Sequence, residues 1–265
     1  MSLHFKIGYI FILLLILLSC ESITELPGID SAESVVVIEA IVTDKFESQK
    51  VRVSRSVPLN DTLNGIPVMD AKVTLYFSNS DRIDFSYSHD DGTIVLYLVP
   101  ADLEYTIEVL VNDSVYIAKG KMVEMDYIDS VYYEKSYNKE LKDSAYFIYI
   151  NGIEPNDDVK YYYLDIIHNH DTISKGGNIY LFSSRFIENI PRQKLPDAFQ
   201  QNDTVIIEFH AISKEMFEYY YVFANQFLYN YSSNGIVMNP PKMFEGGAIG
   251  YFHISQVLKK EFILK

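Results

Sequence analysis

The sequence predicts a mainly β chain with one substantial α-helix. From residue 35 onward, short runs of Val, Ile, Tyr and Thr alternate with charged residues and are separated by turns rich in Asn, Asp, Gly and Pro. The chain contains 22 Tyr and 16 Phe but no Trp, and Tyr and Phe are enriched in strands. One segment, at about residues 213–231, repeats its apolar residues at helical spacing.

The first 20 residues have the pattern of a bacterial lipoprotein signal. Lys6 supplies a positive charge, and an apolar run extends from Ile7 to Leu18. This run is shorter than the roughly 20 residues of a membrane-spanning helix, but it fits a secretory signal. The small residue Ser19 directly before Cys20, with Leu17 three positions before the cysteine, is the pattern that the lipoprotein signal peptidase cuts.

Cys20 is therefore predicted to carry the lipid. Residues 1–19 would be the signal peptide and residues 20–33 a polar, lipidated tether. Several acyl chains, at about 0.8 kcal/mol per buried methylene, hold a protein to a membrane far more firmly than one chain does. Cys20 is the only cysteine, so an intramolecular disulfide is excluded and stability must come from the core. The alternative is an ordinary secretory signal or short membrane anchor with a chance cysteine.

Residues 34–119 are predicted to form an immunoglobulin-like β-sandwich. The predicted strands cover residues 35–42, 50–57, 71–77, 82–87, 93–99, 105–111 and 114–119. Short strands at this regular spacing are typical of such sandwiches.

Residues 120–265 are predicted to form a second β-rich domain that contains the helix. Its strands are expected at residues 129–134, 145–150, 160–168, 179–182 and 203–210, and a Gly-rich loop leads to a final strand. The helix begins where Ser213 can cap it and Glu215 suits the positive end of the helix dipole. It ends before the Asn-Gly pair at residues 234–235.

The charge of the chain limits its partners. A formal net charge of −14 argues against nucleic acid, whose phosphates require Lys and Arg surfaces. The same charge argues against electrostatic adsorption to anionic lipid, so membrane attachment would depend on the acyl chains. The many tyrosines suit a surface that grips carbohydrate or peptide, although a β-rich fold alone accounts for them.

The segment from Asp165 to Asp171 comes nearest to a metal-binding pattern. His168 and His170 are two apart and share a face if this segment is a strand. A catalytic zinc site needs a third ligand, which would come from a distant residue such as His89, His210 or His253. A polar strand end and turn is the favoured interpretation. The clusters at residues 89–92 and 156–158 supply too few oxygens for calcium. No metal site is predicted.

No motif for catalysis or cofactor binding is found. Cys20 is used by the lipid, and no Gly-x-Ser-x-Gly elbow is present. The 36 acidic residues allow some carboxylate pair for glycoside cleavage, but their spacing selects none. The aromatic patch from Phe217 to Tyr221 could face a ligand or partner, although packing in a core is favoured for most of it. Cys20 is thus the one predicted site residue, with no catalytic residue and no cofactor.

Several segments together resemble one protein family. They are residues 36–44, 66–73 and 128–131, the helix from Ser213, and residues 246–252, in this order after the lipobox. The chain resembles the Bacteroidetes family of predicted outer-membrane lipoproteins grouped as domain of unknown function 4249. The resemblance implies a cell-envelope lipoprotein of the kind found beside TonB-dependent receptors. It implies no activity and no catalytic residue.

The sequence therefore favours a non-catalytic lipoprotein of the outer membrane, facing either the periplasm or the surface. It would bind a ligand, not identified by the sequence, or act as an accessory subunit of a TonB-dependent nutrient uptake system. Its partner surface is expected on the helix and the loop at residues 234–247. One alternative is a surface hydrolase of glycan or peptide, which a close, buried carboxylate pair in a cleft would favour. The other is a structural or adhesion protein, which surfaces without pockets would favour.

Overall fold

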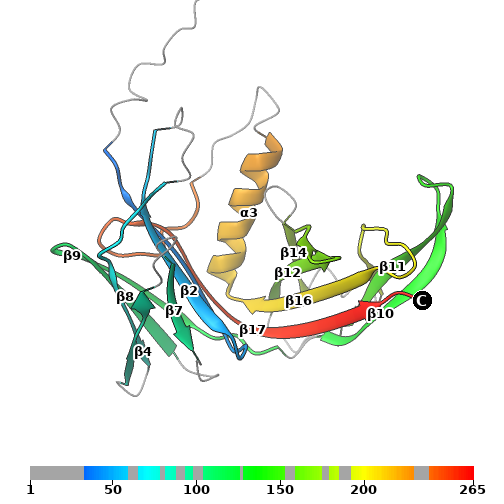
Figure 1. The fold of residues 1–265 in the computed structure, drawn as a ribbon, viewed down its shortest axis with the longest axis horizontal. Coiled ribbons are helices and arrows are strands. Elements are labelled where there is room, and N and C mark those ends of the chain that lie inside the picture. Colours follow the sequence, from blue (N-terminus) through cyan, green and yellow to red (C-terminus); the bar gives the residue numbers. More distant parts are fainter. Residues whose placement is uncertain are drawn as a thin grey trace, which may run out of the picture. The chain divides into compact units, whose positions relative to one another are not determined.

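The computed structural model describes residues 33–58, 65–77, 81–87, 93–97, 104–125, 128–152, 159–174, 179–184, 192–229 and 239–265. The predicted signal and Cys20 lie outside these residues. One compact unit, Ser34–Val57 and Leu63–Lys265, contains nearly all of the described residues. It is built of strands with one helix in its described part, which confirms the predicted mainly β class (Figure 1).

A long mixed sheet runs through the unit. Its strand order is β13-β12-β16-β17-β1-β2-β7-β6. The bounds are β13 Asp171–Thr172, β12 Tyr161–His168, β16 Thr204–Ile212, β17 Ile249–Ile263, β1 Val36–Thr43, β2 Ser48–Arg55, β7 Thr93–Tyr97 and β6 Ser86–Tyr87. Two short strands are added beside this row: β14 (Tyr180–Ser183) pairs with β12, and β3 (Ile66–Pro67) pairs with β2.

The C-terminal strand β17 lies in the middle of this sheet and joins its two halves. Its first half, Ile249 to Ser255, pairs in parallel with β1, and its second half, Gln256 to Ile263, pairs antiparallel with β16. The chain thus returns at its end to the strand that begins its first predicted domain. As a result, the C-terminal strand crosses the boundary that the sequence suggested between residues 119 and 120.

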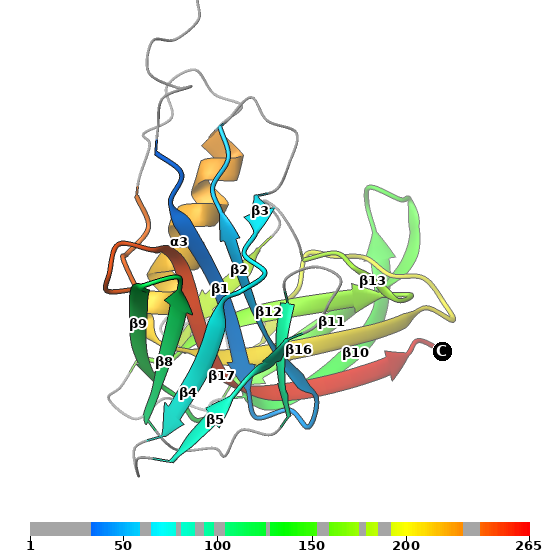
Figure 2. The same cartoon turned by 60° about the vertical axis from the view of Figure 1, so that its left-hand side comes forward.

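The N-terminal half forms a sandwich. A four-stranded sheet, β5 (Arg82–Asp84), β4 (Lys72–Phe77), β8 (Glu104–Val111) and β9 (Ser114–Lys121), packs beside β1 and β2 (Figure 2). Its core includes Ile38, Val51, Leu75 and Ile107, all buried. This arrangement confirms the predicted β-sandwich. The core also contains residues from the other end of the chain, namely Phe244, Ala248, Phe252 and Ile254.

The second half has a core of its own. The strands β10 (Ile128–Asn138), β11 (Asp143–Gly152) and β15 (Gln193–Lys194) form a three-stranded sheet. Apolar side chains of β11 meet those of β12 and β16, and the shared core includes Ile148, Leu164, Ile207 and Phe209. The long sheet therefore contributes one of its faces to both cores.

The predicted helix is present as α3, Lys214–Tyr229. Ser213 caps it as expected, because its Oγ accepts a hydrogen bond from the backbone N–H of Met216 at 3.2 Å. The helix contacts β12, β14 and β17 (Figure 1). In the described part of the chain, no helix has the length and apolar character needed to cross a membrane.

Gly250 permits the parallel pairing of β17 with β1. Its φ is 122°, and it is the register partner of Ile38. A Cβ atom at this position would lie 1.9 Å from the carbonyl oxygen of Ile38. Glycine is therefore the residue that fits, because any side chain would push the two strands apart.

We expect Gly250→Ala to lower the free energy of unfolding by at least about 3 kcal/mol, since it adds a backbone clash to an unfavourable φ. Gly247→Ala is the matched control: its φ is also positive, at 90°, but nothing lies within 4 Å of an added Cβ. The control should lose only about 1–2 kcal/mol. Urea unfolding followed by circular dichroism measures both. Equal losses would show that steric contact with Ile38 is unimportant.

Candidate functional site

The second face of the long sheet carries polar side chains where α3 covers it. Residues two apart on a strand share a face, so each strand sends alternate residues to the cores and to this side. On β17, for example, Phe252 and Ile254 enter the first core, whereas His253 and Ser255 point the other way. The polar residues gathered in this way are Tyr163, Asp165, Glu208, His210, Tyr251, His253 and Ser255.

A cavity of about 310 Å³ lies between α3 and this face. Its walls are mostly aromatic and come from Tyr163, Tyr219, Tyr220, Phe223 and Tyr251. Its charged or titratable residues other than tyrosine are Glu39, Asp165, His210 and His253, and no Lys or Arg of the described residues lines it. His210 and His253 are 5% and 1% exposed and form its floor, whereas Ile41 and Phe223, at 38% and 41%, lie at its mouth.

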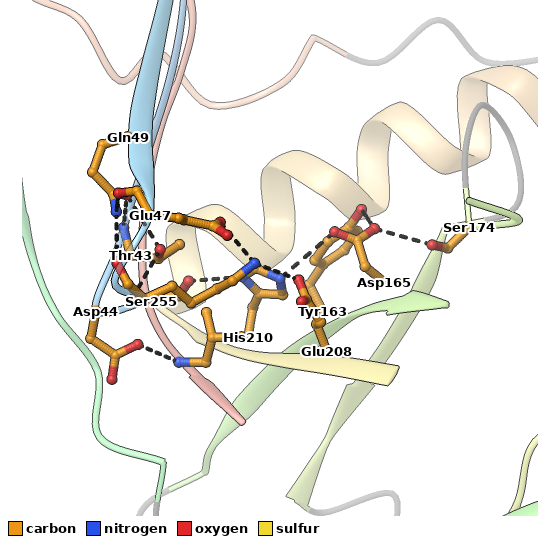
Figure 3. A network of polar contacts seen from close by, with 12 residues as sticks. Thr43, Asp44, Glu47, Gln49, Tyr163, Asp165, Ser174, Glu208, His210 and Ser255 are labelled. Carbon is orange, nitrogen blue, oxygen red and sulfur yellow. Dashed lines mark hydrogen bonds and ion pairs between the residues drawn. The ribbon is translucent and has the colours of Figure 1, made fainter. Parts of the chain in front are cut away.

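A chain of hydrogen bonds runs beneath this cavity. The Tyr220 hydroxyl lies 2.8 Å from His253 Nδ1, and His253 Nε2 lies 2.8 Å from Ser255 Oγ. Ser255 Oγ lies 3.0 Å from Nδ1 of His210, as Figure 3 shows. The far nitrogen of His210, Nε2, is buried and has no hydrogen-bond partner among the described residues. This nitrogen is therefore the open end of an otherwise satisfied network.

The donors and acceptors of this chain can be ordered. A hydroxyl has one hydrogen to donate, and a neutral histidine has one protonated and one bare nitrogen. If Tyr220 donates to His253 Nδ1, then His253 Nε2 donates to Ser255, and Ser255 donates to His210 Nδ1. His210 Nε2 then carries a hydrogen. The reverse order would leave two groups unsatisfied among the described residues, the Tyr220 hydroxyl hydrogen and the bare His210 Nε2. The first order leaves only the hydrogen on His210 Nε2, so we assign it.

Asp165 lies beside the open end of the network. Its Oδ1 accepts hydrogen bonds from the Tyr163 hydroxyl at 2.5 Å and from Ser174 Oγ at 3.1 Å. Its other oxygen, Oδ2, lies 3.7 Å from His210 Nε2, too far for a direct hydrogen bond (Figure 3). Burial raises the pKa of the Asp165 carboxyl above its usual value.

Glu208, the cross-strand partner of Asp165, is held by a cation. Its Oε2 lies 2.8 Å from Nζ of Lys45, which also pairs with Glu47. Burial by itself lowers the pKa of Lys45, but the hydrogen bonds to these two glutamates raise it overall. The condition for a hydrolase is thus met only in part: the two carboxylates are neighbours, but Asp165 lines the cavity and Glu208 does not.

Ser255, His210 and Asp165 have the composition of a catalytic triad but not its geometry. Ser255 is 0% exposed, does not line the cavity, and shares its hydroxyl between two histidines. In a triad the carboxylate hydrogen-bonds directly to one histidine nitrogen, and the serine at the other nitrogen must reach the substrate. Here Asp165 Oδ2 is 3.7 Å from His210 Nε2, too far for that bond, and the serine at Nδ1 is covered. The arrangement orients His210; it does not expose a nucleophile.

The histidines that the sequence suggested as zinc ligands are not brought together as one group. His168 Nε2 pairs with Asp203 at 2.8 Å, and His170 is an exposed turn residue with a φ of 77°. His210 pairs across from Tyr163, five residues before His168 on β12, so the two are roughly 16 Å apart at about 3.3 Å per residue. His89 lies outside the described residues. No cluster of three or more His, Asp or Glu suited to a metal occurs within the described ranges.

A larger cavity, of about 640 Å³, lies at the start of α3. Four lysines line it, Lys119, Lys121, Lys160 and Lys242, together with Glu124 and Glu215. These charged side chains are exposed or half-buried and their charges are mixed. Hydration satisfies such groups, so this cavity offers less selectivity than the smaller one, whose polar groups are buried.

Sequence reasoning missed most of this site. It named His210 and His253 only as distant zinc ligands, and their rings do meet, 5.1 Å apart. In the aromatic helix patch, Tyr219 and Tyr220 face the cavity instead of an apolar core, whereas Tyr221 is exposed. The available signal was polar residues at alternate positions of otherwise apolar strands. Of the expected partner loop at residues 234–247, residues 239–247 are described, and Phe244 is buried in the first core.

Comparisons with known proteins give a family but no activity. A family model described as "Domain of unknown function (DUF4249)" matches residues 23–261. A comparison with curated proteins found no match. Among solved structures, a two-domain fibronectin type-III segment of chicken tenascin is 13% identical, with a TM-score of 0.23; the match covers 68% of this chain and 91% of that one.

The buried histidines predict a loss of stability in acid. Burial lowers the pKa of His253 to about 3 and that of His210 well below its usual value. The folded state keeps both neutral, whereas the unfolded chain takes up protons below about pH 6.5. The contribution of His253 is therefore complete above about pH 6.5 and falls as the pH drops toward 3, by about 1.4 kcal/mol per pH unit. His210 contributes in the same direction.

We expect His253→Gln, which retains a donor and an acceptor but cannot titrate, to reduce this pH dependence by about 1.4 kcal/mol per unit. Urea unfolding at about pH 7 and about pH 5 gives the slope. His170→Gln is the control, because His170 is exposed and should leave the slope unchanged. The same slope in wild type and His253→Gln would contradict burial of a neutral histidine.

Proposed function

The chain belongs to the DUF4249 family, and on this premise we propose that it is a non-catalytic binding protein of the bacterial outer membrane. It is anchored through lipid on Cys20 and captures a small ligand in the cavity beneath α3. It serves as the accessory subunit of a TonB-dependent nutrient receptor. The family match agrees with the resemblance noted in the sequence and leaves the activity open.

The observation that carries the binding role is that His210 Nε2 has no hydrogen-bond partner among the described residues. A buried polar group without a partner costs about 1–3 kcal/mol, so such groups are rare in folded proteins. Here the group ends an ordered network and belongs to a side chain that lines a cavity with mostly aromatic walls. Apolar pockets with a few convergent polar groups are the usual form of small-molecule sites. A ligand that bonds to His210 would remove the cost of leaving it unpaired.

Binding is supported over chemistry by the same geometry. Ser255 of the network is covered. Of the two neighbouring carboxylates, Glu208 forms an ion pair with Lys45. His210, His253 and Asp165 are held in place by hydrogen bonds to neighbouring side chains. Fixed groups of this kind suit selective recognition.

The anchor is supported by the sequence alone. The lipobox ends at Cys20, the polar residues up to about 33 give the domain a tether, and the net charge of −14 makes attraction to anionic lipid unfavourable. The receptor partnership is supported by what the family resemblance implies.

We expect Cys20→Ala to abolish labelling of the protein by radioactive palmitate and to leave the signal peptide uncut, because the lipid is joined to this thiol and the lipoprotein signal peptidase cuts before the lipidated cysteine. Ser19→Ala keeps a small residue before the cysteine and should be labelled and cut as in the wild type. Metabolic labelling and the apparent mass on immunoblots measure both. Palmitate labelling of Cys20→Ala would overturn the lipid anchor.

A tag after the exposed Lys265 allows recovery of the complete protein from its own outer membrane. We expect a TonB-dependent receptor to be recovered with it in near-equal amount, as measured by quantitative mass spectrometry. The Cys20→Ala protein, which lacks the lipid that holds it in the outer membrane, should recover much less receptor. Recovery of the anchored protein alone would reject the accessory role.

A further inference from the structure

We infer that the cavity beneath α3 binds a neutral carbohydrate, one of whose hydroxyl groups accepts a hydrogen bond from His210 Nε2 and donates one to Asp165 Oδ2. This inference rests on the proposed binding function and names the class of its ligand. It follows from the hydrogen-bonding order, the charges and the walls of the cavity.

The first argument is the pairing of a donor with an acceptor. The assigned order of the network places a hydrogen on His210 Nε2, and Oδ2 of Asp165 is an acceptor 3.7 Å away. A hydroxyl oxygen about 2.8–2.9 Å from both atoms closes this gap, since a hydroxyl can accept and donate at once. Two hydroxyls on adjacent carbons would do the same.

The second argument is charge. An anionic ligand would meet two carboxylates and no Lys or Arg among the described residues that line the cavity, and burying an unpaired charge is costly. A cationic amine would suit the carboxylates and the tyrosine rings. It could not, however, accept the hydrogen of His210 Nε2. Glu39 already has a partner, because Arg52 Nη1 lies 3.1 Å from its Oε2. A neutral hydroxyl satisfies both His210 and Asp165.

The third argument is the shape and nature of the walls. Tyr163 and Tyr220 stack at 4.8 Å with an angle of 18°, which makes a fixed aromatic wall. Tyr219 and Tyr251, 5.5 Å apart, provide further rings. Tyrosine combines an apolar face, which packs against the C–H groups of a sugar ring, with a polar tip. A volume of about 310 Å³ is at the small end of ligand sites, so a mono- or disaccharide is expected.

Tyr220 is assigned as a positioning residue in this site. Its hydroxyl starts the donor order that ends at His210 Nε2, although the two groups do not touch. Without that hydroxyl, His253 is free to adopt either tautomer, and so is His210. Tyr220→Phe should therefore alter the protonated nitrogen of His210 while the ring stacking with Tyr163 is kept.

The test uses the full chain in a polyoxyethylene detergent, which contains no sugar. Histidine ring nitrogens are followed by NMR after isotope labelling, and affinity is measured by calorimetry. The sugar probes are the methyl glycosides of glucose, galactose, mannose, xylose and N-acetylglucosamine, with the corresponding β-linked disaccharides. Acetate and phosphate are the anionic probes, and tetramethylammonium and methylammonium the cationic ones.

We expect a protonated Nε2 on both His210 and His253 in the free protein, and a saturable shift of the His210 signal with at least one sugar probe. Asp165→Asn keeps an oxygen for Tyr163 and Ser174 but replaces the free oxygen by a donor, so affinity should fall roughly tenfold or more. The affinity of His210→Phe for the sugar should fall by as much. Its control, His170→Phe, should bind the sugar with the affinity of the wild type. Tyr220→Phe should show mixed tautomers at His210 and weaker binding.

The outcomes separate this inference from the function on which it rests. If a cationic or anionic probe shifts His210 and no sugar does, the carbohydrate inference is overturned and the binding role stands. If none of the probes binds, both are overturned. Sugar binding that is unchanged in Asp165→Asn and His210→Phe would place the sugar elsewhere and overturn the inference as well.

Discussion

The pairing of β17 with two other strands is the constraint on which the rest of the structure depends. Its first half lies parallel to β1 and its second half antiparallel to β16, so one strand joins the sheets of both halves. The close approach of β1 at Gly250 sets the register of the first half. A slip by one residue would turn Phe252 and Ile254 out of their core and turn His253 and Ser255 into it, which makes the register strongly specified.

The candidate site is a consequence of that register. Because Val257 is opposite His210 in the antiparallel half of β17, His253 and Ser255 lie on the same side of the sheet as His210. The parallel half adds Glu39 and Ile41 of β1 to that side. The two apolar cores occupy the other face and support each strand from below. The helix α3 then covers the polar side with its tyrosines and turns an open sheet surface into a cavity. Core packing and site geometry are thus opposite faces of the same strands.

Burial gives the network its properties. It keeps both histidines neutral, and neutral rings can transmit a fixed order of donors and acceptors from Tyr220 to His210. It also raises the pKa of Asp165, the acceptor beside His210, so this carboxylate becomes protonated at a higher pH than an exposed aspartate. The charged pair Lys45–Glu208 lies beside this network but outside the cavity. The protonation of His210 Nε2, the open end of the network, is set by the buried groups of the network.

The sequence by itself determined the strands, the helix with its Ser213 cap, the mainly β class and the family resemblance, because alternation, capping and turn residues are local properties. It also supplied Cys20 as a predicted lipid site, which depends only on neighbouring residues. Only the tertiary structure decided that His210, His253, Ser255 and Asp165 meet. These residues lie on three strands, β12, β16 and β17, and their meeting depends on antiparallel pairings between strands that are far apart in the sequence. Period-two patterns show which residues share a face of one strand, but contacts between strands arise from register and packing, which no local pattern encodes.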